Sequence, residues 1–164
     1  MLDPDRAGAE RSRRAPGEIM TTADQREQNK KTVEQITDVW GSGDVDELDE
    51  VMPEDVVAWV SGIEEPVRGR EAYQEAVSGY RTSFPDFGPE IHSTVAEGDR
   101  VAMHYTGHAT HEGDLMGIEP TGESIEAAGI SLFRVEDGKV AEETNIGDML
   151  GLFEHLGVVE APKK

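Results

Sequence analysis

The sequence predicts an α+β protein in which a cone-shaped, curved antiparallel β-sheet wraps around N-terminal helices and encloses one apolar pocket. Two observations lead to this class. Helical periodicity dominates the first half of the chain, whereas alternation of apolar and polar residues dominates the second half. The strand-like segments of the second half are joined by tight turns, which favour antiparallel neighbours over a parallel, doubly wound sheet.

The first half predicts three helices and one strand. A capping box at Thr22–Gln25 begins a helix that ends at Trp40, where a Gly-Ser-Gly sequence interrupts it. The last of the three helices ends before Pro85, because the residue before a proline avoids the α region. A high content of β-branched residues marks the strand. The predicted elements are helices 22–40, 45–51 and 70–83 and a strand at 55–61.

The second half predicts an antiparallel meander that a short helix closes. Asp137-Gly138 between two apolar runs indicates a hairpin, because a type I′ turn needs a positive φ at both central residues. Asp148 is placed to cap the final helix and Gly157 to end it. The predicted strands are 90–96, 100–111, 123–135 and 139–146.

The charge balance limits the partners. The 164 residues include 35 acidic and 15 basic ones, a formal net charge of -20. Because no basic face exists to neutralise phosphates, we expect neither nucleic acid nor a membrane surface as a partner. Abundant carboxylate with little lysine favours a cytoplasmic protein adapted to high salt. Residues 1–20 predict a disordered tail, and residues 21–164 a single domain.

The predicted strand 101–111 has one apolar face and one face rich in threonine and histidine. Met103, Tyr105 and His111 lie on the apolar face, which we assign to the pocket side. Tyr105 and His111 are then polar groups in an apolar pocket. The opposite face suits the contact surface of a homodimer formed through the sheet.

The histidines of this strand do not predict a metal site. Residues four apart on a strand, such as His104 and His108, lie about 13 Å from one another, whereas metal–nitrogen bonds are about 2 Å long. His111 faces the other side of the sheet. We therefore expect no metal ion, and the chain has no cysteine that could supply a thiolate.

Two carboxylates are placed for acid–base chemistry. Beside an apolar cavity, Glu143 or Asp148 could have a raised pKa and act as general base toward an activated C–H bond. The alternatives are a helix cap for Asp148, which lowers the basicity of a carboxylate, and a solvated group at the mouth of the cone for Glu143. Four further residues are either core or contacts of an apolar ligand: Trp59, Phe84, Met103 and Phe133.

Short segments between residues 97 and 157 form one longer pattern: Glu97–Ala102, Thr110–Gly113, Gly117–Gly122, Phe133–Val135, Asp137–Lys139, Asp148–Leu152 and Leu156–Gly157. In combination they resemble the SnoaL-like polyketide cyclase family, which belongs to the nuclear transport factor 2-like (ketosteroid isomerase-like) superfamily. The resemblance covers about residues 22–157. It implies a cone-shaped α+β fold around one deep pocket, a dimer or larger assembly, and cofactor-free aldol ring closure of an aromatic polyketide ester.

The resemblance also implies roles for single residues. The acid–base aspartate that the family carries on its last strand corresponds to Asn145, and a pocket histidine on the preceding strand corresponds to Ser131. His111 and Asp148 match positions of the family pattern. Asparagine cannot exchange a proton near neutral pH, but it can donate a hydrogen bond to an enolate oxygen.

Three hypotheses of function follow. The first is a cofactor-free cyclase or isomerase of small apolar carbonyl compounds, in which His111 or Asp148 carries the proton while Asn145 and Tyr105 stabilise oxyanion charge. The second is a protein that binds an apolar small molecule without transforming it. The third is a structural dimer whose pocket is collapsed or idle. The expected ligand contacts are Tyr105, Met103, Trp59, Phe84, Ser131, Phe133 and Glu143.

Overall fold

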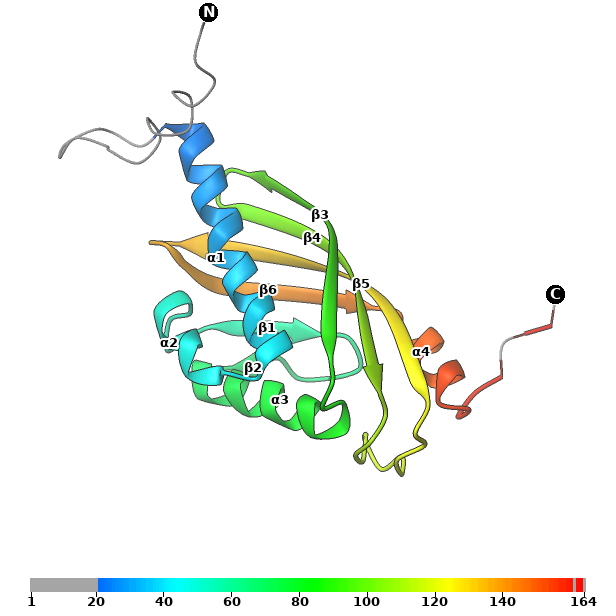
Figure 1. The fold of residues 1–164 in the computed structure, drawn as a ribbon. Coiled ribbons are helices and arrows are strands. Elements are labelled where there is room, and N and C mark those ends of the chain that lie inside the picture. Colours follow the sequence, from blue (N-terminus) through cyan, green and yellow to red (C-terminus); the bar gives the residue numbers. More distant parts are fainter. Residues whose placement is uncertain (1–20, 161, 164) are drawn as a thin grey trace, which may run out of the picture.

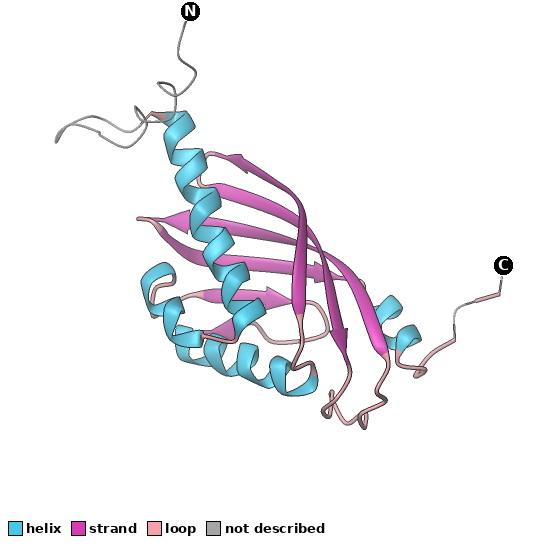
Figure 2. Ribbon diagram, in the orientation of Figure 1, coloured by secondary structure: helices cyan, strands magenta, loops and turns pink. Residues whose placement is uncertain are grey.

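The computed structural model describes residues 21–160 and 162–163, so the predicted tail at residues 1–20 lies outside the described residues. Figures 1 and 2 show helices on one side of a curved sheet. The helices are α1 (Thr22–Ser42), α2 (Leu48–Val51), α3 (Arg70–Ser83) and α4 (Met149–His155), with a 3₁₀ turn at Val45–Glu47. The strands are β1 (Val57–Val60), β2 (Val67–Arg68), β3 (Gly88–Glu97), β4 (Arg100–Thr110), β5 (Ser124–Glu136) and β6 (Lys139–Gly147).

The strands form one sheet in the order β2-β1-β6-β5-β4-β3, which confirms the α+β class. All neighbouring strands are antiparallel except β1 and β6, which run parallel with Val60 opposite Asn145. The sheet is therefore mixed and not wholly antiparallel. The chain between β1 and β6 passes through α3 and the meander of β3 to β5, and a connection of that length can return it in the same direction.

Helix α1 covers the concave face of the sheet and contacts β3, β4 and β6 (Figure 1). Its capping box is formed by Thr21 and Asp24, one residue earlier than predicted, and it runs past the expected end to Gly43, whose φ is 79°. Helix α3 has the predicted bounds. The hairpin between β5 and β6 is also confirmed, with φ values of 51° at Asp137 and 77° at Gly138.

Buried apolar side chains form two clusters. The larger cluster joins α1, α2 and α3 to the sheet and includes Val33, Ile36 and Val101. The smaller one gathers Phe84, Ile125 and Leu152 near α4. Trp40 packs against both clusters, so it lies where they meet. None of the described helices is long and apolar enough to cross a membrane.

Candidate functional site

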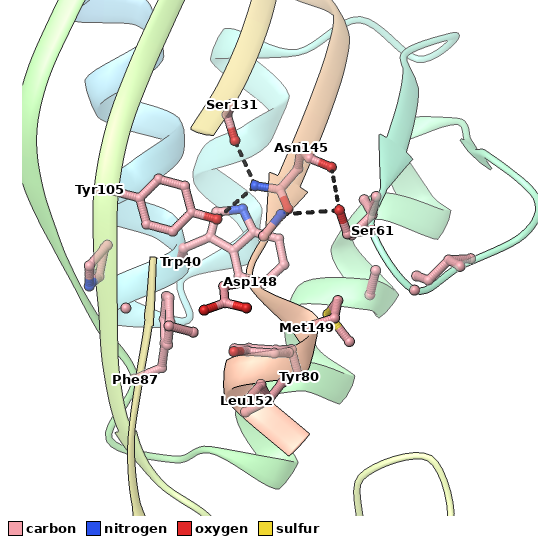
Figure 3. Close-up of a pocket in the computed structure, with 18 of the residues that line it drawn as sticks. Trp40, Ser61, Tyr80, Phe87, Tyr105, Ser131, Asn145, Asp148, Met149 and Leu152 are labelled. Atoms are coloured by element: carbon pink, nitrogen blue, oxygen red, sulfur yellow. Dashed lines mark hydrogen bonds between the residues drawn. The ribbon is translucent and has the colours of Figure 1, made fainter. Parts of the chain in front are cut away.

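A pocket of about 490 Å³ lies between the concave face of the sheet and helices α1, α3 and α4 (Figure 3). This volume is in the range of small-molecule sites, which argues against a collapsed pocket. The described residues that line it include no lysine, arginine or histidine, and the charged ones are Asp114, Glu143 and Asp148. Large apolar and aromatic side chains form most of the wall: Ile36, Trp40, Tyr80, Phe87, Met103, Phe133, Met149 and Leu152.

Three polar side chains meet on the sheet side of the pocket. The Nδ2 atom of Asn145 donates to the Tyr105 hydroxyl at 2.7 Å and to Ser131 Oγ at 2.8 Å (Figure 3). The three residues come from β6, β4 and β5, and Ser131 lies directly opposite Asn145 in the ladder. The site therefore contains adjacent hydrogen-bonding groups on an otherwise apolar wall.

Gly129 makes room for the Tyr105 side chain. A Cβ atom at position 129 would lie 2.5 Å from the Tyr105 hydroxyl and 2.6 Å from Cζ, distances that real Cβ atoms do not adopt. Because position 129 has no side chain, the phenol ring can lie across β5 and reach Asn145. Burial raises the pKa of Tyr105, so the hydroxyl remains protonated at neutral pH.

Ser61 fixes the backbone at Asn145. Its Oγ donates to the Asn145 carbonyl at 3.1 Å and accepts the Gly147 N–H at 3.0 Å. These bonds, drawn in Figure 3, tie the loop after β1 to the end of β6. The hydrogen bonds to Ser61 therefore fix the backbone that carries the Asn145 side chain.

Glu143 is a buried carboxylate with two hydroxyl partners. Tyr73 donates to its Oε2 at 2.6 Å, and Ser131 donates to its Oε1 at 3.1 Å. Trp40 Nε1 in turn donates to the Tyr73 hydroxyl at 2.9 Å. Burial raises the pKa of Glu143, and the two hydrogen bonds oppose part of that rise. Of the two alternatives for Glu143, the solvated group at the mouth of the cone is therefore wrong, because only 6% of the residue is exposed.

Asp148 lines the pocket and caps α4 at the same time. Its Oδ1 accepts the Gly151 N–H at 2.8 Å, which confirms the predicted cap. The carboxylate lies against Gly151, where a Cβ atom would collide with it. The Asp148 carboxylate is exposed and already engaged by the backbone at the start of α4.

His111 faces the concave side as predicted, but it does not reach the pocket. It is fully buried, its Nδ1 accepts the Thr121 N–H at 3.2 Å, and its ring centroid lies 5.5 Å from that of Phe84. The next residues of the chain, Glu112 and Gly113, donate to the carbonyl of Ser83 at the end of α3. The chain thus closes over the end of β4, and this closure buries His111 away from any ligand.

Two predicted ligand contacts also lie elsewhere. Trp59 is 50% exposed, because its neighbour Ala58 takes the buried position and alternation turns Trp59 to the outer face of the sheet. Phe84 packs between the rings of Tyr80 and His111 in the smaller cluster and does not line the pocket. The other predicted ligand contacts line it, and so do two of the predicted catalytic residues. The contacts are Met103, Tyr105, Ser131, Phe133 and Glu143, and the catalytic residues are Asn145 and Asp148.

Four residues of the site were not predicted from the sequence: Tyr73, Trp40, Phe87 and Gly129. Tyr73 and Tyr80 share the apolar face of α3, a signal that indicates burial but not what the hydroxyls contact. Gly129 gives no signal, because only the Tyr105 ring of the neighbouring strand shows why a side chain is absent there. Within the described part of the chain, no group of three histidine, aspartate or glutamate side chains could hold a metal ion.

Comparisons with known proteins agree with this architecture. The family model described as SnoaL-like polyketide cyclase matches residues 30–156. Among curated proteins, the aklanonic acid methyl ester cyclase DnrD of Streptomyces peucetius is 30% identical over 95 residues. That match covers 56% of this chain and 63% of DnrD, so the chain spans less than two thirds of that relative.

Solved structures extend the likeness to the whole fold. AclR of Streptomyces galilaeus, a candidate hydroxylase, has a TM-score of 0.74 at 28% identity, covering 85% of this chain and 91% of AclR. IdmH of Streptomyces antibioticus, a candidate polyketide cyclase, has a TM-score of 0.70 at 29% identity, covering 80% of this chain and 99% of IdmH.

Proposed function

The chain belongs to the SnoaL-like polyketide cyclase family, and from this premise we propose that it is a cofactor-independent enzyme that closes a ring in an apolar, polyketide-like carbonyl compound by acid–base proton transfer. The relative DnrD is, by its name, a cyclase of aklanonic acid methyl ester. The pocket supports an uncharged ligand of this kind, because its described lining offers carboxylates and no cation to pair with an acid or a phosphate.

The observation that carries the proposal is the pair formed by Tyr105 and Asn145 inside the apolar pocket. The Tyr105 oxygen accepts the Asn145 amide N–H, so its own proton can be donated to a ligand. A carbonyl oxygen placed there receives a hydrogen bond that strengthens as the enolate develops. In a desolvated site such a donor lowers the barrier without reorganisation of solvent.

Turnover of aklanonic acid methyl ester, followed by chromatography and mass spectrometry at molar salt, tests this proposal. The expected product has the mass of the substrate, because an intramolecular aldol closure loses no atoms. Tyr105→Phe should lower kcat by about 10²–10³. Gly129→Ala, which keeps the hydroxyl but displaces the ring, should act in the same direction. Binding of the ester without any conversion by the wild type would refute the enzymatic proposal.

A second candidate function is binding without catalysis. It is favoured by Asn145, which cannot exchange a proton, and by the engagement of Asp148 as a helix cap. Native mass spectrometry of the purified protein separates the two functions. A co-purified apolar compound at unit stoichiometry that survives incubation unchanged favours the binder, whereas its conversion favours the enzyme.

Proton transfer in the enzymatic proposal requires a carboxylate of the pocket. Asp148 and Glu143 both line it, on either side of Asn145 in the sequence. His111, the other carrier expected from the sequence, has no route to the ligand because it does not line the pocket. The third lining carboxylate, Asp114, accepts the Gly117 N–H in the loop after β4. We therefore compare Glu143 and Asp148, the two that flank Asn145.

A homodimer formed through the outer face of the sheet is part of the proposal. Five apolar side chains are exposed there and form what we call the outer patch: Trp59, Val95, Ile130, Leu132 and Ile146. Ile130 lies directly opposite Ile146 in the ladder, and β5 and β6 are central strands, so the outer patch is continuous across them. Exposed apolar patches of this kind mark interfaces between proteins.

Light scattering at molar salt, where charge repulsion is screened, tests the dimer. The wild type should have twice the mass of the chain. Ile130→Glu combined with Leu132→Glu should yield a monomer with unchanged helix content. A monomeric wild type would remove the dimer from the proposal.

A further inference from the structure

The proposed reaction needs a proton acceptor, and Asn145, which contacts Tyr105 and Ser131 in the pocket, cannot serve as one. We propose that Glu143 accepts the substrate proton through the hydroxyl of Ser131, so that Ser131 and Glu143 form a proton relay. This inference rests on the proposed function.

The relay is a continuous line of hydrogen bonds on adjacent strands. Asn145 Nδ2 donates to Ser131 Oγ at 2.8 Å, and Ser131 Oγ donates to Glu143 Oε1 at 3.1 Å. Both Ser131 and Glu143 line the pocket, although only 3% of Ser131 and 6% of Glu143 is exposed. The Ser131 oxygen has a second lone pair, which is the acceptor that a substrate C–H would meet first.

The surroundings of Glu143 suit a base that must change charge. Its hydrogen-bond donors are the neutral hydroxyls of Tyr73 and Ser131, and no cation pairs with it among the described residues. A buried carboxylate without a counter-charge binds a proton readily. Asp148 differs on each point: it is exposed, and its Oδ1 already accepts the Gly151 N–H at the start of α4.

The step can be written with every atom placed. The C–H bond beside the substrate carbonyl breaks, its proton goes to Ser131 Oγ, and the Ser131 hydroxyl proton moves to Glu143 Oε1. The electron pair of the C–H bond passes to the carbonyl oxygen, where the Tyr105 hydroxyl donates to the resulting enolate. After the enolate carbon attacks a second carbonyl, the new alkoxide takes the proton of Glu143 back through Ser131. No redox partner or cofactor enters the balance.

Hydrogen–deuterium exchange of a simple ketone measures the first half of this step. The probe is 2-acetylnaphthalene, a flat apolar ketone whose methyl protons are lost from the ¹H NMR spectrum as deuterium enters. We expect the wild type to accelerate this exchange and the rate to rise with pH through one ionisation. Glu143→Gln should lower the enzymatic rate by about 10²-fold or more and remove that pH dependence. Ser131→Ala should lower it while the carboxylate remains.

Glu142→Gln is the matched control, because it makes the same chemical change one residue away. Glu142 is exposed and pairs with Arg134, so the exchange rate should stay that of the wild type. Binding of the ketone, followed by quenching of Trp40 fluorescence in a Trp59→Phe background, verifies that each variant is folded and has an intact pocket.

Two results would overturn the inference while the proposed function stands. One is exchange or ester turnover by Glu143→Gln at the rate of the wild type. The other is loss of exchange in Asp148→Asn but not in Glu143→Gln, which would assign the proton to the helix cap. If the wild type catalyses neither exchange nor ester turnover, both the relay and the proposed function are refuted.

Discussion

Glu143 and His111 are both buried polar residues on the concave side of the sheet, but their surroundings are opposite. Each carboxylate oxygen of Glu143 accepts a hydrogen bond from a hydroxyl, and the residue lines the pocket. The Nδ1 atom of His111 accepts a hydrogen bond from the Thr121 N–H, and its Nε2 atom has no hydrogen-bond partner among the described residues. His111 does not line the pocket. One site is connected to a ligand cavity, and the other is sealed in an apolar cluster.

This difference arises from where each residue lies along its strand and not from which face of the sheet it occupies. Both residues point inward by alternation. Glu143 lies in the middle of β6, where Ser131 of the next strand and Tyr73 of α3 reach it. His111 follows the last residue of β4, where the chain turns to contact the end of α3. A concave face therefore offers a chemical site only where the helices leave a cavity above it.

The largest expected effect concerns the sealed site. His111→Ala should lower the free energy of unfolding by about 2–4 kcal/mol, because it leaves a cavity in a packed cluster. The exchange rate per folded molecule should not change. Denaturant unfolding and the ketone exchange measure the two quantities. His92→Ala, which removes an exposed histidine, should change stability by no more than about 0.5 kcal/mol.

Loss of exchange in folded His111→Ala would contradict this comparison between the two sites. It would mean that His111 reaches the ligand in some arrangement other than the one described, as the family pattern alone suggested.

Most of the fold could be predicted from local patterns. The bounds of α3, the turn at Asp137-Gly138 and the cap at Asp148 all follow from residues close in the sequence. The parallel pairing of β1 with β6 could not be predicted, because it joins residues such as Val60 and Asn145 that are far apart in the chain. The two-residue strand β2 is too short for any periodicity.

The site was harder to predict, because alternation gives a side chain's face but not its neighbours. Met103 and Tyr105 were placed correctly by the alternation of a long strand. Trp59 was placed on the wrong face. In a strand of only four residues, the alternation is too short to show which face points inward, and here Ala58 takes the buried position. The burial of Glu143 depends on Tyr73, which is 70 residues away, so no local pattern contains it.

A smaller effect is expected where Glu143 loses a partner. Tyr73→Phe removes the hydroxyl that donates to Oε2 and leaves the Trp40 N–H without its acceptor. We expect a loss of about 1–3 kcal/mol in the free energy of unfolding. Because this hydrogen bond lowers the pKa of Glu143, its loss should move the pH dependence of ketone exchange upward. Tyr80→Phe removes a hydroxyl from the same helix that has no bond to Glu143, so the pH dependence should stay.

The smallest expected effect is a difference in how stability depends on pH for two adjacent residues, Glu142 and Glu143. Burial raises the pKa of Glu143 in the folded state, whereas the hydrogen bond from Arg134 lowers the pKa of Glu142. In the unfolded chain both carboxyls ionise near the ordinary glutamate pKa of about 4.3. As the pH rises through the raised pKa of Glu143, ionisation favours the unfolded chain, so Glu143 loses its contribution to stability. Glu142 gains its contribution at lower pH, between its lowered pKa in the folded state and the pKa of the unfolded chain.

Thermal unfolding from about pH 3 to about pH 7 should therefore give opposite trends for two variants. The stability of wild type relative to Glu143→Gln should fall as the pH rises, and relative to Glu142→Gln it should rise slightly, because an exposed ion pair contributes little. A constant offset from the introduced amide does not matter, since only the slope reports the ionisation. Molar salt should flatten the Glu142 slope and leave that of Glu143, because a buried charge is poorly screened. Equal slopes for the two variants would mean that Glu143 titrates like a surface group, and the contrast between a buried base and its solvated neighbour would be lost.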